Sequence, residues 1–129
     1  MEYLSCSVNI GVKSVNDSVK FYQEVLGFNL VMSMPPESGN FVWAMVQGGG
    51  VVMMFQQEES LKEEYPFLAD KPLNACLNFY IKMKGMAELY EKIKDTKYLA
   101  QERHVTPYGA DEFAMYDNNG YVITITEDK

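Results

Sequence analysis

The segment Trp43-Ala-Met-Val-Gln-Gly-Gly-Gly-Val-Val-Met-Met-Phe-Gln56 is the best guide to the fold, because a later segment of the chain resembles it. The second copy is Phe113-Ala-Met-Tyr-Asp-Asn-Asn-Gly-Tyr-Val-Ile-Thr-Ile-Thr126. At a constant offset of 70 residues, the matching pairs are Ala44 and Ala114, Met45 and Met115, Gly50 and Gly120, and Val52 and Val122. Each copy is a short β run, a turn rich in Gly or Asn and a second β run, which predicts a β-hairpin.

Two further windows repeat upstream in the same order. Residues 7–12 match residues 76–81 at an offset of 69, and residues 18–25 match residues 86–93 at an offset of 68. The offset between the matching windows thus changes by one residue at a time. Differences in loop length between two duplicated modules produce such a change. The three windows therefore predict an internal duplication in which each half runs strand, helix and then further strands.

Periodicity and turn residues set the expected elements. In the first half we expect a strand over 7–12, followed by a helix that carries Val19, Tyr22 and Val25 on one side. Asn16 or Asp17 is expected to cap the start of this helix, and Gly27 is expected to end it. Further strands are expected over 28–34, 41–46 and 51–57, with a turn-rich loop over 35–39. In the second half we expect a strand over 75–82, a helix over 85–95 and strands over 98–104, 111–117 and 121–127.

The whole chain is expected to form one domain. Residues 1–57 are the first module, 58–73 a linker with a short helix, and 74–129 the second module. The Glu residues of the linker are interpreted as the solvated face of that helix; they are Glu58, Glu59, Glu63 and Glu64.

Composition narrows the functional classes. The chain has 129 residues, a formal net charge of −7, two Cys and one His. The acidic balance argues against nucleic acid as a partner and favours neutral or cationic ligands. The N-terminus lacks the basic and apolar regions of a secretory signal, and no apolar run is long enough for a membrane span. We therefore expect a cytoplasmic protein with reduced cysteines and no membrane partner.

Two segments resemble a known family. Asp17-Ser-Val-Lys-Phe-Tyr-Gln-Glu-Val-Leu-Gly-Phe28 is similar to the pattern S-x-x-F-Y-x-x-x-L-G-F of the glyoxalase/bleomycin-resistance/extradiol-dioxygenase (vicinal oxygen chelate) superfamily. The segment from Pro107 to Gly120 resembles the family's C-terminal pattern and points to its bleomycin-resistance-like branch. This chain has Asn118 where the family usually has Pro and Tyr121 where it often has Asn, so the turn after Asp117 is expected to differ.

The resemblance implies an α+β fold of two tandem βαβββ modules whose curved mixed sheets enclose a cleft. Strand alternation then assigns one set of residues to the helix side and another to the cleft. The helix side receives Val8, Ile10, Val12, Leu77, Phe79 and Ile81. The cleft side receives Ser7, Asn9, Cys76, Asn78 and Tyr80.

Enzymes of this superfamily hold a divalent metal with His or Glu at four strand positions. The resemblance places these positions at Ser7, Met54, Cys76 and Thr124. Hydroxyls and a thioether are poor ligands for Zn²⁺, Mn²⁺, Ni²⁺ or Fe²⁺, so we expect no metal and no other cofactor. A soft Cu(I) site made from Met54 and Cys76 is the alternative.

The site is therefore expected to bind a ligand and to contain no catalytic residue. The candidate ligand-binding residues are Asn9, Trp43, Met54, Cys76, Asn78, Tyr80, Tyr108 and Thr124. Aromatic rings stack on planar heterocycles, and they also attract cations. The sequence leaves open which face of its strand Trp43 occupies. A homodimer is implied by the resemblance.

Three functions remain open at this stage. The first is a metal-free protein that sequesters a planar or cationic small molecule such as an antibiotic. The second is a glyoxalase-like lyase or isomerase, or a dioxygenase, with a displaced metal site or with acid–base chemistry through His104, Glu112 or Glu127. The third is a protein–protein interaction or regulatory module that kept the fold and lost the cavity.

Overall fold

The computed structural model describes residues 1–36 and 39–129 and divides the chain into two compact units, Met1–Leu73 and Asn74–Lys129. Glu37 and Ser38, which belong to the predicted turn-rich loop, lie outside the described residues. The segment 58–73 is part of the first unit, where its helix packs on two strands. Within the described ranges, no helix has the length and apolar character needed to cross a membrane.

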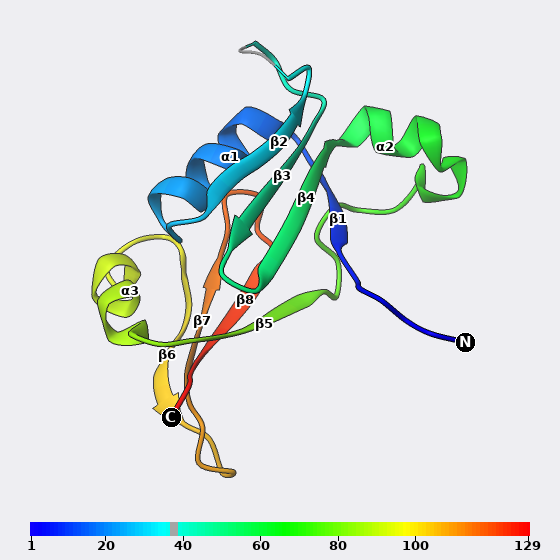
Figure 1. The fold of residues 1–129 in the computed structure, drawn as a ribbon. Helices are drawn as coiled ribbons and strands as arrows, with labels where there is room; N and C mark the ends of the chain where they lie inside the picture. Colours follow the sequence, from blue (N-terminus) through cyan, green and yellow to red (C-terminus); the bar gives the residue numbers. More distant parts are fainter. Residues whose placement is uncertain (37–38) are drawn as a thin grey trace. The chain divides into compact units, whose positions relative to one another are not determined.

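The first unit contains one four-stranded sheet, two helices and a short 3₁₀ turn (Figure 1). The strands lie in the order β1-β4-β3-β2, with β1 parallel to β4 and the other neighbours antiparallel. The elements are β1 (Val8–Val12), α1 (Val15–Glu24), β2 (Asn29–Met34), β3 (Trp43–Gly48), β4 (Val51–Gln57), α2 (Glu58–Glu64) and η1 (Pro66–Leu68).

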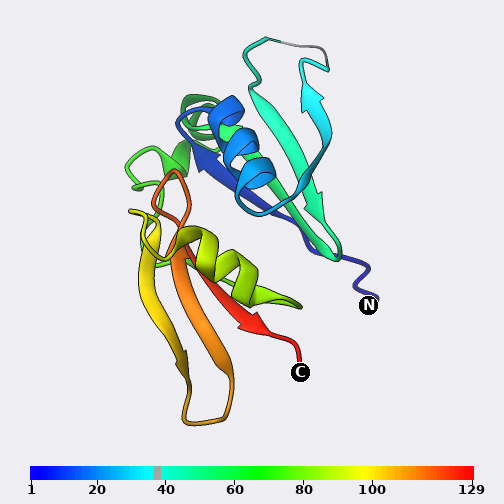
Figure 2. The same ribbon diagram turned by 90° about the vertical axis from the view of Figure 1, so that its left-hand side faces the viewer.

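The second unit repeats this topology (Figure 2). Its strands lie in the order β5-β8-β7-β6, and β5 is parallel to β8. The elements are β5 (Asn78–Met83), α3 (Met86–Ile93), β6 (Leu99–Val105), β7 (Asp111–Tyr116) and β8 (Val122–Glu127). The predicted α+β fold of two βαβββ modules is confirmed.

One face of the first sheet is buried by α1. Strand alternation brings together on this face Ile10, Val12, Ala44, Val46, Met53 and Phe55, each less than 5 % exposed. The ring of Tyr22 on α1 lies 4.8 Å from the ring of Phe55 and completes the core. Each large apolar side chain buried in this way contributes about 1.5–3 kcal/mol, so this face holds the unit together.

The N-terminus of α1 differs from the predicted one. Ser14, rather than Asn16 or Asp17, is the N-cap, and its hydroxyl accepts a hydrogen bond from the backbone N–H of Asp17 at 3.1 Å. The Asn16 side chain is used elsewhere, because it bonds the backbone of Gly39 and Phe41 at 2.7 and 2.9 Å. The prediction that Gly27 ends the helix is confirmed, since its φ of +74° is one that L side chains rarely adopt.

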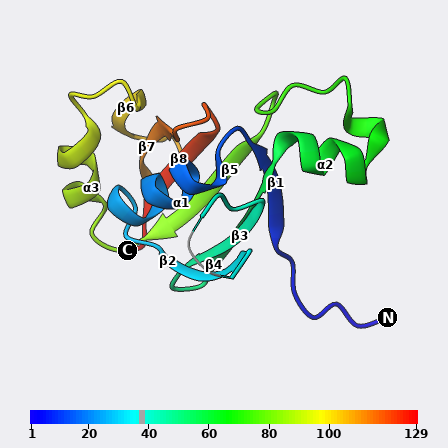
Figure 3. The same cartoon turned by 90° about the horizontal axis from the view of Figure 1, so that it is seen from above.

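The second sheet is covered in the same manner by α3 (Figure 3). Phe113, Met115, Ile123 and Ile125 are at most 1 % exposed, and Met86, Leu89 and Ile93 of α3 are buried as well. The Tyr90 ring of α3 packs 5.1 Å from Phe113. The side chain of Glu127 accepts hydrogen bonds from the N–H groups of Gly85 and Met86 at 2.9 and 3.3 Å, which caps the start of α3.

One of the repeat alignments is wrong by a residue. Ala44 pairs with Phe55 on the face covered by α1, whereas Ala114 pairs with Thr124 on the face opposite to α3. The hairpins differ in length: the first turns through two residues between β3 and β4, and the second through residues 117–121. Asp117 accepts hydrogen bonds from the N–H groups of Asn119 and Tyr121 in that longer turn. The Ala-Met identities of the two copies therefore do not mark equivalent positions.

The predicted first strand of the second module also begins too early. β5 starts at Asn78, and Cys76 precedes it with a positive φ of 50°. Leu77 therefore lies outside the strand, where it is 40 % exposed, and Val8 at the start of β1 is 38 % exposed. The assignment of Leu77 to the helix side fails because Leu77 is not part of β5. Val8 keeps the predicted helix side, since it pairs with the buried Met53, but it stands at the exposed start of β1.

We expect Gly48→Ala to destabilise the protein by about 1–3 kcal/mol, the usual cost of overpacking a core. A Cβ at Gly48 would lie 2.5 Å from the Phe28 ring, which is 9 % exposed and packs on Tyr22. Gly50→Ala is the matched control, because its Cβ would meet nothing within 4 Å. Urea unfolding of both variants checks the prediction, and equal midpoints would contradict it.

Candidate functional site

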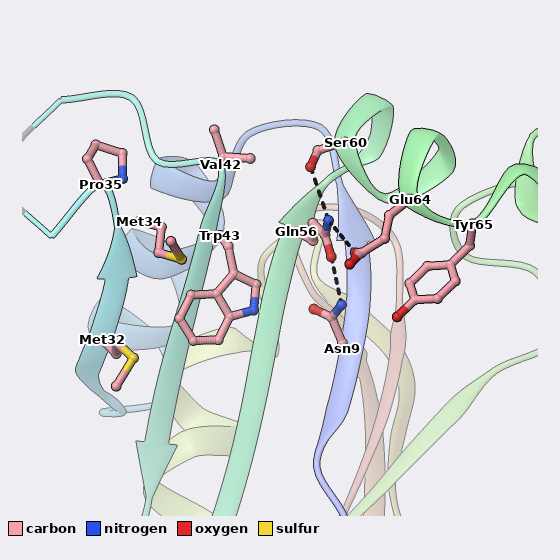
Figure 4. A pocket seen from close by; sticks show the side chains of 10 residues that line it. All are labelled: Asn9, Met32, Met34, Pro35, Val42, Trp43, Gln56, Ser60, Glu64 and Tyr65. Atoms are coloured by element: carbon pink, nitrogen blue, oxygen red, sulfur yellow. Dashed lines mark hydrogen bonds between the residues drawn. The ribbon is translucent and has the colours of Figure 1, made fainter.

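A pocket of about 700 Å³ lies on the sheet face of the first unit that α1 does not cover (Figure 4). We call this the pocket face. It receives side chains from all four strands of the first sheet, and α2 adds a wall at the β1–β4 side. The lining residues are Asn9, Met32, Met34, Pro35, Val42, Trp43, Gln56, Ser60, Glu64 and Tyr65. Its volume is in the range typical of small-molecule sites.

The β2–β3 side of the pocket is apolar and polarisable. Trp43 is half-buried and pairs across the strands with Met34, while Met32 lies on the same face further along β2. Figure 4 shows the indole and the two methionines side by side on this wall. Thioethers adapt their shape to what they contact, and indole offers a flat surface for stacking. This wall suits a planar, apolar partner.

The β1–β4 side of the pocket is polar and hydrogen-bonded in a chain (Figure 4). The Asn9 Nδ2 group donates to Gln56 Oε1 at 2.9 Å. Gln56 Nε2 in turn donates to Ser60 Oγ at 3.0 Å and to Glu64 Oε1 at 3.1 Å. Gln56 is 8 % exposed, so the middle of this chain is shielded from water and its geometry is well defined.

Two groups of this polar wall, the Glu64 carboxylate and the Asn9 amide oxygen, belong to residues that line the pocket. Glu64 is the one charged side chain among the ten described residues that line the pocket, and it is exposed. Asn9 Oδ1 is buried and has no hydrogen-bond partner among the residues that the structure describes. Buried polar atoms are nearly always paired, so a ligand group that donates a hydrogen bond to this oxygen would satisfy it.

The close approach of α2 to the sheet positions Ser60 and Glu64. Gly11, on the same face as Asn9, has no side chain, and a Cβ there would lie only 3.0 Å from Leu73 and 3.2 Å from Leu61. These two leucines pack where a side chain would otherwise stand. Ser60 and Glu64 are four residues apart, so they lie on one side of the helix and both reach Gln56.

The structure places two of the predicted ligand-binding residues, Asn9 and Trp43, in this pocket. It also resolves the face of Trp43, which is the pocket face. Met54 lies on this face beside Met45 but outside the lining set. The residues that sequence reasoning missed are Met32, Met34, Pro35, Val42, Gln56, Ser60, Glu64 and Tyr65.

The prediction for Glu64 is incomplete. Its side chain is exposed, as expected for a solvated helix face, but it also hydrogen-bonds Gln56 and lines the pocket. The i, i+4 spacing of Ser60 and Glu64 was a signal for a shared helix side. It did not show that this side points at the sheet.

The remaining predicted residues belong to the second unit. Asn78, Tyr80 and Thr124 share the sheet face opposite to α3, and Asn78 donates to Thr124 Oγ1 at 2.9 Å. Tyr108 is exposed in the turn between β6 and β7. Cys76 is exposed before β5.

The face of the second sheet opposite to α3 also holds a buried carboxylate. The Tyr80 hydroxyl donates to Glu112, which is 5 % exposed. This hydrogen bond is the main cause that raises the pKa of Tyr80 above its ordinary value of 10.0, because losing the proton would leave two negative groups in contact. His104 lies opposite Glu112 in the register but is exposed, and its Nδ1 lies 2.8 Å from the carbonyl oxygen of Glu102.

The four positions that the superfamily uses for a metal do not fit a divalent ion in this chain. Thr124 Oγ1 is engaged by Asn78, Cys76 stands outside its strand, and Ser7 and Met54 supply only a hydroxyl and a thioether. Zn²⁺, Mn²⁺, Ni²⁺ and Fe²⁺ prefer imidazole and carboxylate ligands. Across residues 1–36 and 39–129, no three His, Cys, Asp or Glu side chains group closely enough to hold a metal ion.

Comparison with known proteins agrees with this fold and identifies the family. A model of the Glyoxalase/Bleomycin resistance protein/Dioxygenase superfamily matches residues 6–125, and the chain belongs to this superfamily. No curated protein sequence matches the chain significantly.

Several solved structures share the fold at low sequence identity. TioX from Micromonospora sp. ML1 has a TM-score of 0.73 and 16 % identity, covering 94 % of this chain and 95 % of its own. A bleomycin-binding protein complexed with bleomycin has a TM-score of 0.65 and 19 % identity, covering 98 % and 100 %. A bleomycin resistance determinant encoded on the transposon Tn5 has a TM-score of 0.67 and 18 % identity, covering 98 % and 99 %.

We expect the titration of the wild-type protein to contain one tyrosine ionisation above pH 10, and we expect this ionisation to be missing from the Tyr80→Phe variant. Because the folded-state pKa of Tyr80 is raised, its hydrogen bond to Glu112 stabilises the fold below pH 10 and is lost as the pH rises through that pKa. Absorbance at 295 nm, recorded against pH for both proteins while circular dichroism reports folding, gives the difference curve. A midpoint at or below pH 10 would contradict the assignment.

Proposed function

We propose that this protein is a metal-free binder that sequesters a planar, cationic small molecule, such as an antibiotic, in the pocket of its first unit. The observation that carries the proposal is the pairing of two unlike walls: the indole of Trp43 on one side and the carboxylate of Glu64 on the other. A ligand that is flat and positively charged uses both walls at once.

The apolar wall supports a flat ligand. Trp43, Met32 and Met34 together present an extended apolar surface that solvent reaches, since the two methionines are 56 % and 60 % exposed. Covering this surface with an aromatic ring removes apolar area from water and adds stacking. An aliphatic polar ligand would gain neither contribution.

The charge of the pocket supports a cation. Glu64 is the last residue of α2, where the carbonyl ends of the helix add to the negative potential. The nearby Lys62 is paired with Glu58 at 2.8 Å and does not reach Glu64 in the salt bridges of the described residues. The net charge of −7 also attracts cations from a distance.

Proteins with a similar fold also support the proposal of a small-molecule binder. Among them are a protein described as bleomycin-binding and complexed with bleomycin, and a bleomycin resistance determinant. At 19 % and 18 % identity these likenesses concern the fold, so the choice of ligand rests on the pocket of this chain.

Two accompanying properties are also proposals: that the protein forms a homodimer, and that it acts in the cytoplasm. The predicted ligand contacts of the second unit, which are Cys76, Asn78, Tyr80, Tyr108 and Thr124, would contribute if the assembly brings them to a ligand. Sedimentation equilibrium of the purified chain tests the dimer, and a monomer across the accessible concentrations would refute it.

We expect Trp43→Ala to weaken binding of a planar cation by about 2 kcal/mol or more, roughly thirtyfold in Kd, as for other buried aromatic anchors. The probe is 9-aminoacridine in isothermal titration calorimetry, with bleomycin as a second ligand. Because Trp43 is the single tryptophan, quenching of its fluorescence in the wild type locates the ligand. Tyr3→Ala is the control, since Tyr3 is exposed and outside the pocket.

Three results would overturn the proposal. The first is the absence of binding heat for both ligands. The second is an equal loss of affinity in Trp43→Ala and Tyr3→Ala. The third is near-stoichiometric Zn, Ni, Mn or Fe in the purified protein together with a lyase activity that a chelator removes.

We expect Glu64→Gln to weaken 9-aminoacridine binding about tenfold at low salt, because the ligand loses one partly shielded opposite charge. The difference should shrink as salt rises from 20 mM to 500 mM. Glu63→Gln is the matched control: it removes the same charge from the neighbouring residue, which lies outside the pocket. Equal effects of the two variants would show that overall charge, and not Glu64, attracts the cation.

A further inference from the structure

We infer that the hydrogen-bond chain Glu64–Gln56–Asn9 holds an accepting oxygen in the pocket and thereby selects cations that carry N–H donors. Amidinium, guanidinium and amino-substituted heteroaromatic groups fit this description. Quaternary cations, which have no N–H, do not. The inference rests on the proposed function, because it refines which planar cation the pocket takes.

The chain starts at Glu64, whose chemistry fixes the first orientation. A carboxylate only accepts hydrogen bonds, so the group of Gln56 that faces it must be the NH₂. This agrees with the contact of Gln56 Nε2 with Glu64 Oε1 at 3.1 Å. Ser60 is compatible with this orientation of Gln56, because its hydroxyl oxygen accepts a hydrogen bond from the same NH₂ group at 3.0 Å.

The orientation of Gln56 then fixes that of Asn9. With its NH₂ turned towards α2, Gln56 presents Oε1 to β1, and only a donor can face that oxygen. The Asn9 Nδ2 group occupies this place at 2.9 Å. Gln56 is 8 % exposed. Flipping either amide would therefore place two donors or two acceptors against each other, with no water to satisfy their hydrogen bonds.

The consequence is the orphan oxygen of Asn9. Once Nδ2 is committed to Gln56, Asn9 Oδ1 is left as an acceptor, and it is buried with no partner among the described residues. Figure 4 shows this oxygen on the side of the amide away from Tyr65. A ligand that offers a donor would pair this oxygen, whereas a ligand without one would leave it unpaired, which is the situation that sites use to reject analogues lacking an N–H or O–H.

The charge and the acceptor act on the same ligand group. Glu64 favours a positive ligand, and Asn9 Oδ1 favours one whose positive group has a hydrogen to donate. Hydrogen bonds from a charged donor are the stronger ones. Selectivity should therefore separate two cations of equal charge and similar shape.

The experiment compares two planar acridine monocations by calorimetry at pH 7. The amino group of 9-aminoacridine supplies N–H donors, and 10-methylacridinium has none. In the wild type we expect the amino compound to bind at least tenfold more tightly. In Asn9→Leu, which keeps the size of the side chain without the acceptor, the ratio of the two Kd values should fall to about one.

A second variant tests the chain without touching the orphan oxygen. In Glu64→Gln the new amide can donate or accept, so Gln56 and Asn9 are no longer held in one orientation. Both cations lose affinity because the charge is gone, and in addition their ratio should fall towards one. Glu63→Gln should leave the ratio at its wild-type value. Since Glu64 is exposed, this variant is expected to fold even if Asn9→Leu does not.

The outcomes separate this inference from the proposed function. If both cations bind equally well to the wild type and Trp43→Ala weakens both, the planar-cation function stands and the selection by Asn9 is refuted. A wild-type ratio above ten that persists in Glu64→Gln refutes the chain as its cause. If neither cation binds, the proposed function fails and the inference falls with it.

Discussion

A four-stranded sheet covered by one helix can bury only one of its two faces, and this constraint shapes the whole protein. In the first unit α1 covers the face that carries Ile10, Val46 and Phe55, and side chains two residues apart on a strand stay together. The opposite face is therefore free to carry residues that a dry core would reject. The pocket, the methionines and the polar chain all lie there as a direct result.

Gln56 is the point at which structure and proposed function meet. A buried amide has four hydrogen-bonding sites to satisfy, and in this place its partners come from β1 and from α2. The same contacts that hold α2 against the sheet also decide which atom of Asn9 is left over. The proposed binding preference thus follows from the need to satisfy the hydrogen bonds of a buried amide. Because α2 supplies two of the partners of this amide, the preference depends on α2.

The duplicated topology and the faces of Asn9 and Tyr80 could be predicted, since both follow from periodicity within single segments. The Ala44–Ala114 equivalence failed because identities near a turn do not reveal that one hairpin loop is longer than the other. Glu64 was missed for a related reason. From the sequence, a charged residue on a short helix is assigned to solvent unless the element against which that helix packs is known.

The amino-acid sequence was sufficient to predict the βαβββ repeat, most of the residues that each sheet turns towards its helix, and the absence of imidazole and carboxylate at the family's metal positions. These are local properties of strand alternation and residue type. The packing of Leu61 and Leu73 over Gly11, which brings Ser60 and Glu64 within reach of Gln56, became evident only from the folded chain. That meeting depends on the angle at which α2 crosses the sheet, which is set by packing between residues far apart in the chain.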